Sequence, residues 1–88
     1  MVERVIVLNR VHERYPDIDP EDVCAAWDDV LICRPRVDTE PLEYVAIGTD
    51  GRGRLLELVA VDAGDAWIIK HAQTPPQEGI KRELGLGR

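Results

Sequence analysis

His71 is the side chain in this sequence that best suits acid–base chemistry near neutral pH. Imidazole alone titrates in that range without perturbation, so we expect His71 to act as a general acid or base. The alternative is a histidine that caps a sheet edge by hydrogen bonds. The second histidine, His12, lies on the opposite side of any helix from Arg14, so at most one of these two residues can face a site.

Two arginines flank a tight glycine turn and are the candidate phosphate ligands. Arg52 and Arg54 lie on either side of Gly53, where exposed backbone N–H groups and two guanidinium forks could bind a phosphate. The alternative is a pair of solvated turn arginines. The segment lacks the spacing and the strand-to-helix context of a nucleotide-binding glycine loop.

Glu57 and Lys70 complete the candidate site. Their simplest interpretation is a cross-strand ion pair on a half-solvated sheet face, which contributes little free energy. In the functional interpretation, Glu57 is an alternative base and Lys70 is a reserve phosphate ligand. The predicted site therefore has His71, Arg54 and Glu57 as catalytic residues, with Arg52 and Lys70 as substrate-binding residues.

Other chemistries find little support. The chain contains no serine, so a serine nucleophile is excluded. The two cysteines and two histidines are not spaced as C-x-x-C or H-x-x-x-H, so we predict no metal site and no cofactor. We expect both Cys24 and Cys33 to be reduced thiols, with Cys24 as a small core residue of a helix.

Composition indicates a single folded domain of 88 residues with a net charge of −6. This charge argues against nonspecific binding of nucleic acid. The acids are concentrated in residues 1–30, so the second half could still present a local basic patch.

No apolar run is long enough to span a membrane, and Arg10 and His12 interrupt any signal peptide. We therefore expect a cytoplasmic protein with no membrane contact.

The elements that must position these residues suggest an α+β domain. Asp19 and Pro20 are typical of a helix start, and Asp50-Gly51 begins a strong turn. The apolar run at 5–8 is either a first strand or the start of a helix, which periodicity cannot settle. The expected elements are helices at about 9–15 and 20–31, a loop at 34–41, strands at 43–48, 54–61 and 66–71, and a short helix at about 77–84. We thus predict two N-terminal helices, a three- to four-stranded antiparallel sheet and a short C-terminal helix.

The pairing of the last two strands decides which charges meet. With a two-residue turn after Asp62, Glu57 faces Lys70, and Arg54 and His71 share one sheet face. With a three-residue loop, Glu57 faces His71 and the last strand flips. The sequence does not choose between these registers.

Taken together, these segments resemble a known family. The stretches VHERY at 11–15 and PEDVCAAW at 20–27 are similar to the helical start of the BrnT-type toxins, small members of the RelE/ParE superfamily. The stretch EYVAIGTDGRGRLLELV at 43–59 is similar to the sheet of that family. The likeness spans roughly residues 9–71 and is a pattern of elements and small motifs.

The resemblance implies a RelE-like fold and a ribonuclease toxin that works without a metal and is blocked by a small antitoxin protein. By this resemblance, Arg54 is the best candidate for a residue that acts on the RNA, and His71 is the next best. The C-terminal sequence after His71 and the acidic composition depart from the family, as in a divergent branch. The alternative is a non-catalytic protein-binding module on the same scaffold. RNA as substrate, an antitoxin partner and a second copy of the chain are the partners that we consider.

Overall fold

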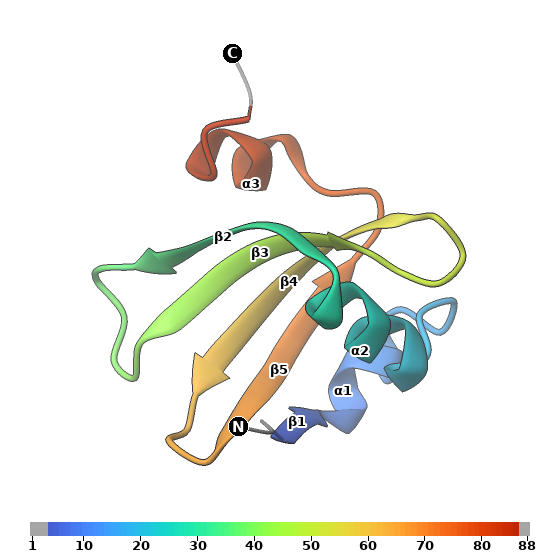
Figure 1. Cartoon of the computed structure of the whole chain (residues 1–88), viewed down its shortest axis with the longest axis horizontal. Coiled ribbons are helices and arrows are strands. Elements are labelled where there is room, and N and C mark those ends of the chain that lie inside the picture. The colour runs from blue at the N-terminus through green and yellow to red at the C-terminus, as the bar shows by residue number, and fades with distance from the viewer. Residues whose placement is uncertain (1–3, 87–88) are drawn as a thin grey trace.

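The computed structural model describes residues 4–86 and arranges them around one sheet (Figure 1). The elements follow in the order β1 (Arg4–Val7), α1 (Asn9–Arg14), α2 (Pro20–Asp28), β2 (Val30–Arg36), β3 (Glu43–Thr49), β4 (Leu55–Asp62), β5 (Ala66–Gln73) and α3 (Glu78–Glu83). The longest helix, α2, has nine residues. Within the described chain no helix is long and apolar enough to cross a membrane.

The sheet is mixed and has five strands, so the predicted architecture of two helices followed by a three- to four-stranded antiparallel sheet, the RelE-like arrangement, is wrong. The strand order is β1-β5-β4-β3-β2, with β1 parallel to β5 and every other neighbouring pair antiparallel. The chain is a small α+β domain in which a strand precedes the helices. The short apolar run at 5–8 forms this strand because it pairs with β5, about 60 residues further along the chain.

Strand β2 occupies a segment that the sequence suggested would be a helix end and a loop. Pro35 and the arginines on either side of it made this segment look irregular. An edge strand tolerates proline because one side of its backbone has no sheet partner. Here β2 pairs only with β3, with Pro35 opposite Tyr44, and α2 ends at Asp28 to make room for it.

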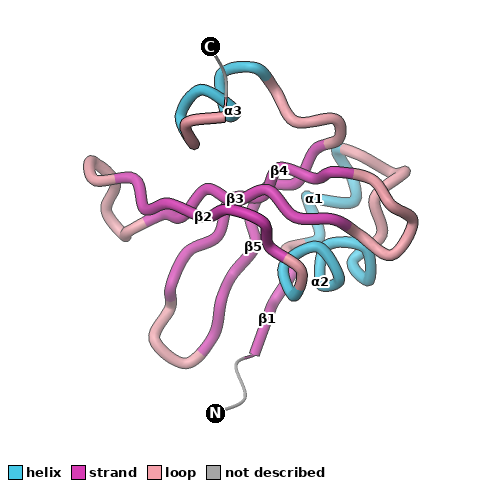
Figure 2. Tube along the Cα trace, turned by 45° about the horizontal axis from the view of Figure 1, so that its top comes forward, coloured by secondary structure: helices cyan, strands magenta, loops and turns pink. Residues whose placement is uncertain are grey.

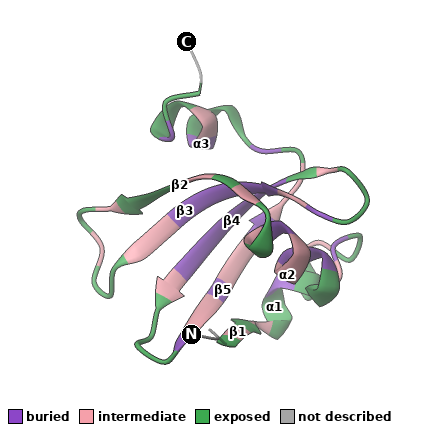
Figure 3. Ribbon diagram, in the orientation of Figure 1, coloured by how far each residue is buried: buried purple, intermediate pink, exposed green. Residues whose placement is uncertain are grey.

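Helices cover both faces of the sheet. Figure 2 shows α1 and α2 on one side of the strands and α3 on the other. The larger core cluster joins α1 and α2 to one face, through side chains that include Val11, Val23 and Leu58. A smaller cluster joins Ile80 and Leu84, in and just after α3, to the opposite face of β3. The central strands β3 and β4 are the most buried part of the chain (Figure 3).

Close contact between α2 and β3 depends on one glycine. A Cβ atom placed on Gly48 would lie 2.0 Å from the backbone oxygen of Ala26 in α2. Only a residue without a side chain fits there.

Helix α2 starts as predicted, with Asp19 as N-cap and Pro20 in its first turn. Asp22 accepts a hydrogen bond of 2.8 Å from the N–H of Asp19.

Candidate active site around His71

A β-bulge in β5 sets the direction of the candidate catalytic side chains. Ala60 pairs with Ile69 and Val59 pairs with His71, so Lys70 is an extra residue on β5. The observed pairing matches neither of the two registers that the sequence left open. A bulge of this kind changes the direction of neighbouring side chains and is frequent next to active sites. It places His71 on the same sheet face as Glu57.

His71 and Glu57 form a close pair. The Nε2 atom of His71 lies 2.7 Å from Oε2 of Glu57. The Glu57 side chain is 1% exposed, whereas the His71 side chain is 26% exposed. The imidazole therefore connects a buried carboxylate to the surface. A histidine oriented in this way by a carboxylate is a common arrangement for acid–base chemistry.

Gln77, just before α3, fixes Glu57 from the other side. Its backbone N–H donates to Oε1 of Glu57 at 2.7 Å, and its side-chain amide donates to Oε2 at 2.9 Å. Glu57 acts as an acceptor for these donors, so we assign the proton on Nε2 of His71 to the bond with Glu57. Nδ1 of the neutral imidazole then carries a lone pair and has no hydrogen-bond partner among residues 4–86.

Two surface hollows meet at the bulge. One has a volume of about 460 Å³ and lies between α1 and the end of β5, with Tyr15 and His71 in its lining. The other, about 340 Å³, lies on the face under α3 and is lined by Glu57, Gln77 and His71 among others. Lys70 and His71 belong to both hollows. A ligand could therefore reach the imidazole from either side.

Two arginines of α1 supply free positive charge beside His71. Arg10 and Arg14 line the larger hollow, and neither forms an ion pair with any residue in the described range. The Nε atom of Arg10 donates to the backbone oxygen of Lys70 at 3.3 Å, which holds the guanidinium at the edge of β5. Both guanidinium groups can attract an anion, because neither is in an ion pair with a carboxylate of the described chain, although Glu13 also lines the hollow.

Lys70 is less available to bind an anion than Arg10 and Arg14, because its ammonium group pairs with Glu43. Glu43 also accepts a bond of 3.1 Å from Arg36, which in turn pairs with Glu83 at 2.8 Å and 3.2 Å. The hydrogen bond from Lys70 and the further bond from Arg36 lower the pKa of Glu43, against the opposing effect of burial. This chain of ion pairs ties α3 to β2, β3 and β5.

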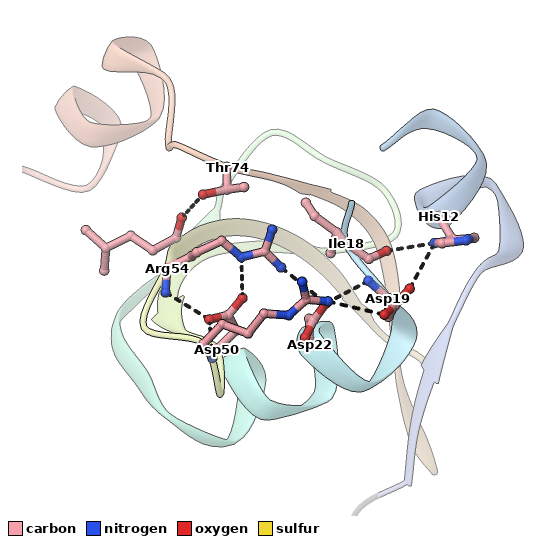
Figure 4. A network of polar contacts seen from close by, with 9 residues as sticks. His12, Ile18, Asp19, Asp22, Asp50, Arg54 and Thr74 are labelled. Atoms are coloured by element: carbon pink, nitrogen blue, oxygen red, sulfur yellow. Dashed lines mark hydrogen bonds and ion pairs between the residues drawn. The ribbon is translucent and has the colours of Figure 1, made fainter. Parts of the chain in front are cut away.

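Arg52 and Arg54, the predicted phosphate ligands, are held by aspartates. Arg54 lies beside Asp50 and Asp22 of α2 (Figure 4), and Arg52 contacts the same Asp22. Arg54 donates to Asp50 at 2.8 Å and to Asp22 at 3.2 Å, and Arg52 donates to Asp22 at 2.9 Å. Burial would raise the pKa of Asp50, but hydrogen bonds from the backbone and guanidinium of Arg54 outweigh it and lower that pKa. These arginines connect the β3–β4 turn to the start of α2.

The structure thus brings together some of the predicted site residues and separates others. His71 and Glu57 are in direct contact, and Lys70 is the neighbouring residue in the bulge. Arg52 and Arg54 contact the helix face instead, so the expected face shared by Arg54 and His71 is not formed. His12 also lies apart, with Nδ1 at 2.9 Å from the backbone oxygen of Ile18.

Sequence reasoning missed several residues of this site. Arg10 and Tyr15 line the larger hollow, and Gln77 holds Glu57. One signal was available, because Arg10 and Arg14 have the i, i+4 spacing that places two side chains on one helix face. The role of Gln77 had no local signal, since it depends on how α3 folds back over the sheet.

The described chain shows no group of three or more His, Cys, Asp or Glu side chains that could hold a metal ion. Cys24 in α2 and Cys33 in β2 are free thiols, and Cys24 is only partly buried and does not occupy the core position expected for it. Comparisons with protein families, with curated proteins and with solved structures find no significant match.

Proposed function

We propose that this chain is a metal-independent endoribonuclease, the toxin-side component of a toxin–antitoxin pair of the BrnT type. The observation that carries the proposal is the 2.7 Å contact between His71 and the buried Glu57, next to a hollow lined by Arg10 and Arg14, which have no ion-pair partner among residues 4–86. The likeness of segments 11–15, 20–27 and 43–59 to BrnT-type toxins supports the same activity. The site would act in the cytoplasm.

The geometry supports a cleavage that uses the 2′-hydroxyl of RNA. Nδ1 of His71 takes the proton of that hydroxyl, and the oxygen attacks the adjacent phosphorus. The bond from phosphorus to the 5′-oxygen breaks, which leaves a 2′,3′-cyclic phosphate and a 5′-hydroxyl end. Glu57 stabilises the imidazolium that forms. The leaving oxygen takes its proton from water or from the ammonium group of Lys70.

Positive charge beside the imidazole would stabilise the transition state. Arg10 and Arg14 face no carboxylate partner in the described chain, so they can bind the phosphate oxygens as negative charge develops. Arg52 and Arg54 do not contribute to this step, because aspartates hold them beside the start of α2 and neither lines the hollows at His71.

RNA cleavage by purified protein in the presence of a chelator tests the proposal. Wild type should cut an RNA strand to products with a cyclic phosphate end. His71→Ala should slow cleavage by roughly 10²- to 10⁴-fold, because it removes the proton-transfer group. His12→Ala is the matched control, since His12 is an exposed histidine outside both hollows, and it should retain activity.

Wild-type protein that neither cuts RNA nor arrests growth on expression would overturn the enzyme proposal. The alternative is a non-catalytic module that binds a partner protein. The net charge of −6 and the 64% exposure of Leu31 on edge strand β2 favour it. Copurification with a small neighbouring gene product would fit both functions, so cleavage is the measurement that separates them.

A further inference from the structure

Three surface hollows lie in a row across the molecule and share residues at each junction. The hollow under α3 shares Lys70 and His71 with the larger hollow beside α1. The larger hollow shares Arg14 and Tyr15 with a third hollow of about 120 Å³, which reaches Thr74. We refer to the three together as the His71–Tyr15 row.

The side chain of Tyr15 lines both the larger hollow and the third hollow, and its ring is held in place. Its hydroxyl donates to Oε1 of Gln73 at 2.8 Å, which anchors the far end of the side chain to β5. The ring lies edge-on to the imidazole of His71, with 6.3 Å between ring centroids and an angle of 84° between the planes. Both rings are partly exposed. An aromatic side chain held in this way next to unpaired arginines is typical of sites that stack nucleobases.

The balance of charge along the row is less negative than that of the whole molecule, so the row is the better place for an anion. Its lining contains four basic side chains and four carboxylates, whereas the chain has a net charge of −6. The basic residues are Arg10, Arg14, Arg36 and Lys70, and the carboxylates are Glu13, Asp17, Glu43 and Glu57. Arg36 and Lys70 pair with Glu43 and with Glu83 of α3, so the arginines of α1 are the basic residues of the row with no ion pair among residues 4–86.

We propose that the His71–Tyr15 row binds consecutive nucleotides of a single RNA strand, with a nucleobase stacked on Tyr15 and the neighbouring phosphate on Arg10 and Arg14. This inference rests on the proposed function, because it places the phosphate to be cut at His71. A base-paired strand cannot use the row, since its bases stack on one another and are not free to contact Tyr15. The substrate is therefore unpaired RNA.

Binding of a strand that cannot be cut separates this inference from catalysis. The probe is a fluorescently labelled 2′-O-methyl RNA, which lacks the attacking hydroxyl, and the readout is fluorescence anisotropy. We expect affinity to rise with length up to about three nucleotides, one for each hollow, and then to level off. The same sequence in a duplex should bind much more weakly.

Variants of Tyr15 and Arg14 test the individual contacts. Tyr15→Ala should weaken binding by roughly 5- to 150-fold, which is the usual range for loss of one base–aromatic stack. Tyr15→Phe should retain most of the affinity because the ring remains. Arg14→Gln should reduce the dependence of log affinity on log salt concentration by about 0.7, the value for one lost phosphate contact on a single strand.

Arg82→Gln is the matched control, because Arg82 is exposed and unpaired within residues 4–86 but lies on α3 outside the row. It should change neither affinity nor salt dependence. Equal binding of duplex and single strand, or unchanged binding in both Tyr15→Ala and Arg14→Gln, would overturn the inference even if the protein cuts RNA. Normal binding without cleavage would support the row and contradict the nuclease. Circular dichroism checks that each variant is folded.

Discussion

Glu57 is a carboxylate at a sheet position where a buried side chain is ordinarily apolar. It is 1% exposed and is stabilised by His71 and by two bonds from Gln77. Burying a charge is costly unless hydrogen bonds compensate for it. The residue therefore has a role in orienting the imidazole that a leucine at the same position could not perform.

Glu57→Gln tests this role with nearly the same side-chain shape. The amide has one acceptor oxygen in place of two, so at least one donor from His71 or Gln77 loses its partner. We expect the free energy of unfolding to fall by about 1–3 kcal/mol and RNA cleavage to slow as well. Urea denaturation and the cleavage assay measure the two effects. Full activity in a folded Glu57→Gln variant would show that the carboxylate does not assist His71.

Arg54 forms ion pairs inside the fold and does not contact His71. The side chain of Asp50 is fully buried, and Arg54 is its ion-pair partner at 2.8 Å. Arg54→Ala should therefore lower the free energy of unfolding by about 3 kcal/mol, because it leaves a buried charge without its partner. Thermal unfolding followed by circular dichroism measures the loss. If Arg54→Ala remains as stable as wild type but loses RNA binding, the original assignment of Arg54 as a phosphate ligand would be right.

At the scale of elements, α2 and β3 show how closely a helix can approach a sheet. Gly48 leaves room for the backbone of Ala26. Gly48→Ala should force the two elements apart and lower the free energy of unfolding by about 1–3 kcal/mol. Gly51→Ala is the control, because a Cβ atom there meets nothing within 4 Å and its stability should be almost unchanged. Equal denaturation midpoints for the two variants would contradict this packing.

Local signals predicted the helices and the central strands better than the edges of the sheet. The N-cap at Asp19 and the turn at Asp50 lie within a few residues of the elements that they begin or end, so they could be recognised. Strand β1 depends on a distant partner, and β2, although it pairs with the next strand, contains Pro35 and carries a weak pattern of its own. The sheet order therefore could not be obtained from the sequence.

The site was predictable in part for the same reason. His71 and Glu57 stand out by their chemistry, and one of the two possible registers, that with the three-residue loop, has them face each other. The bulge at Lys70 has no sequence pattern, so the observed pairing was not among the alternatives. Arg54 was misplaced because the charges that hold it, Asp22 and Asp50, come from separate elements.

At the scale of the whole molecule, ion pairs between distant segments make stability depend on pH. The pKa of Glu83 is lowered mainly by its hydrogen bond with Arg36, and the pKa values of Glu43 and Asp50 are also below their ordinary range. In the unfolded chain these carboxyls bind protons at higher pH. The stability that they provide is therefore complete above the ordinary carboxyl range of about 4 and decreases as the pH falls through the lowered values.

Urea denaturation between pH 3 and pH 7 measures this dependence. The free energy of unfolding should be nearly constant from pH 7 to about pH 5 and should then fall steadily in acid. Glu83→Gln should make the acid decrease shallower, because one of the carboxyls with a lowered pKa is absent. A stability that does not change down to pH 3 would contradict the ion pairs between α3 and the sheet.

The parallel pairing of β1 with β5 has a consequence for synthesis of the chain on the ribosome. Residues 4–7 must wait for residues 66–69 before they join the sheet, and Glu57 is not fixed until Gln77 has followed. Long-range pairings of this kind form late. A nascent chain therefore lacks an ordered His71–Glu57 pair until Gln77 has been translated. For a protein proposed to cut RNA, this timing delays any damage to its own messenger until the sheet and α3 have been made.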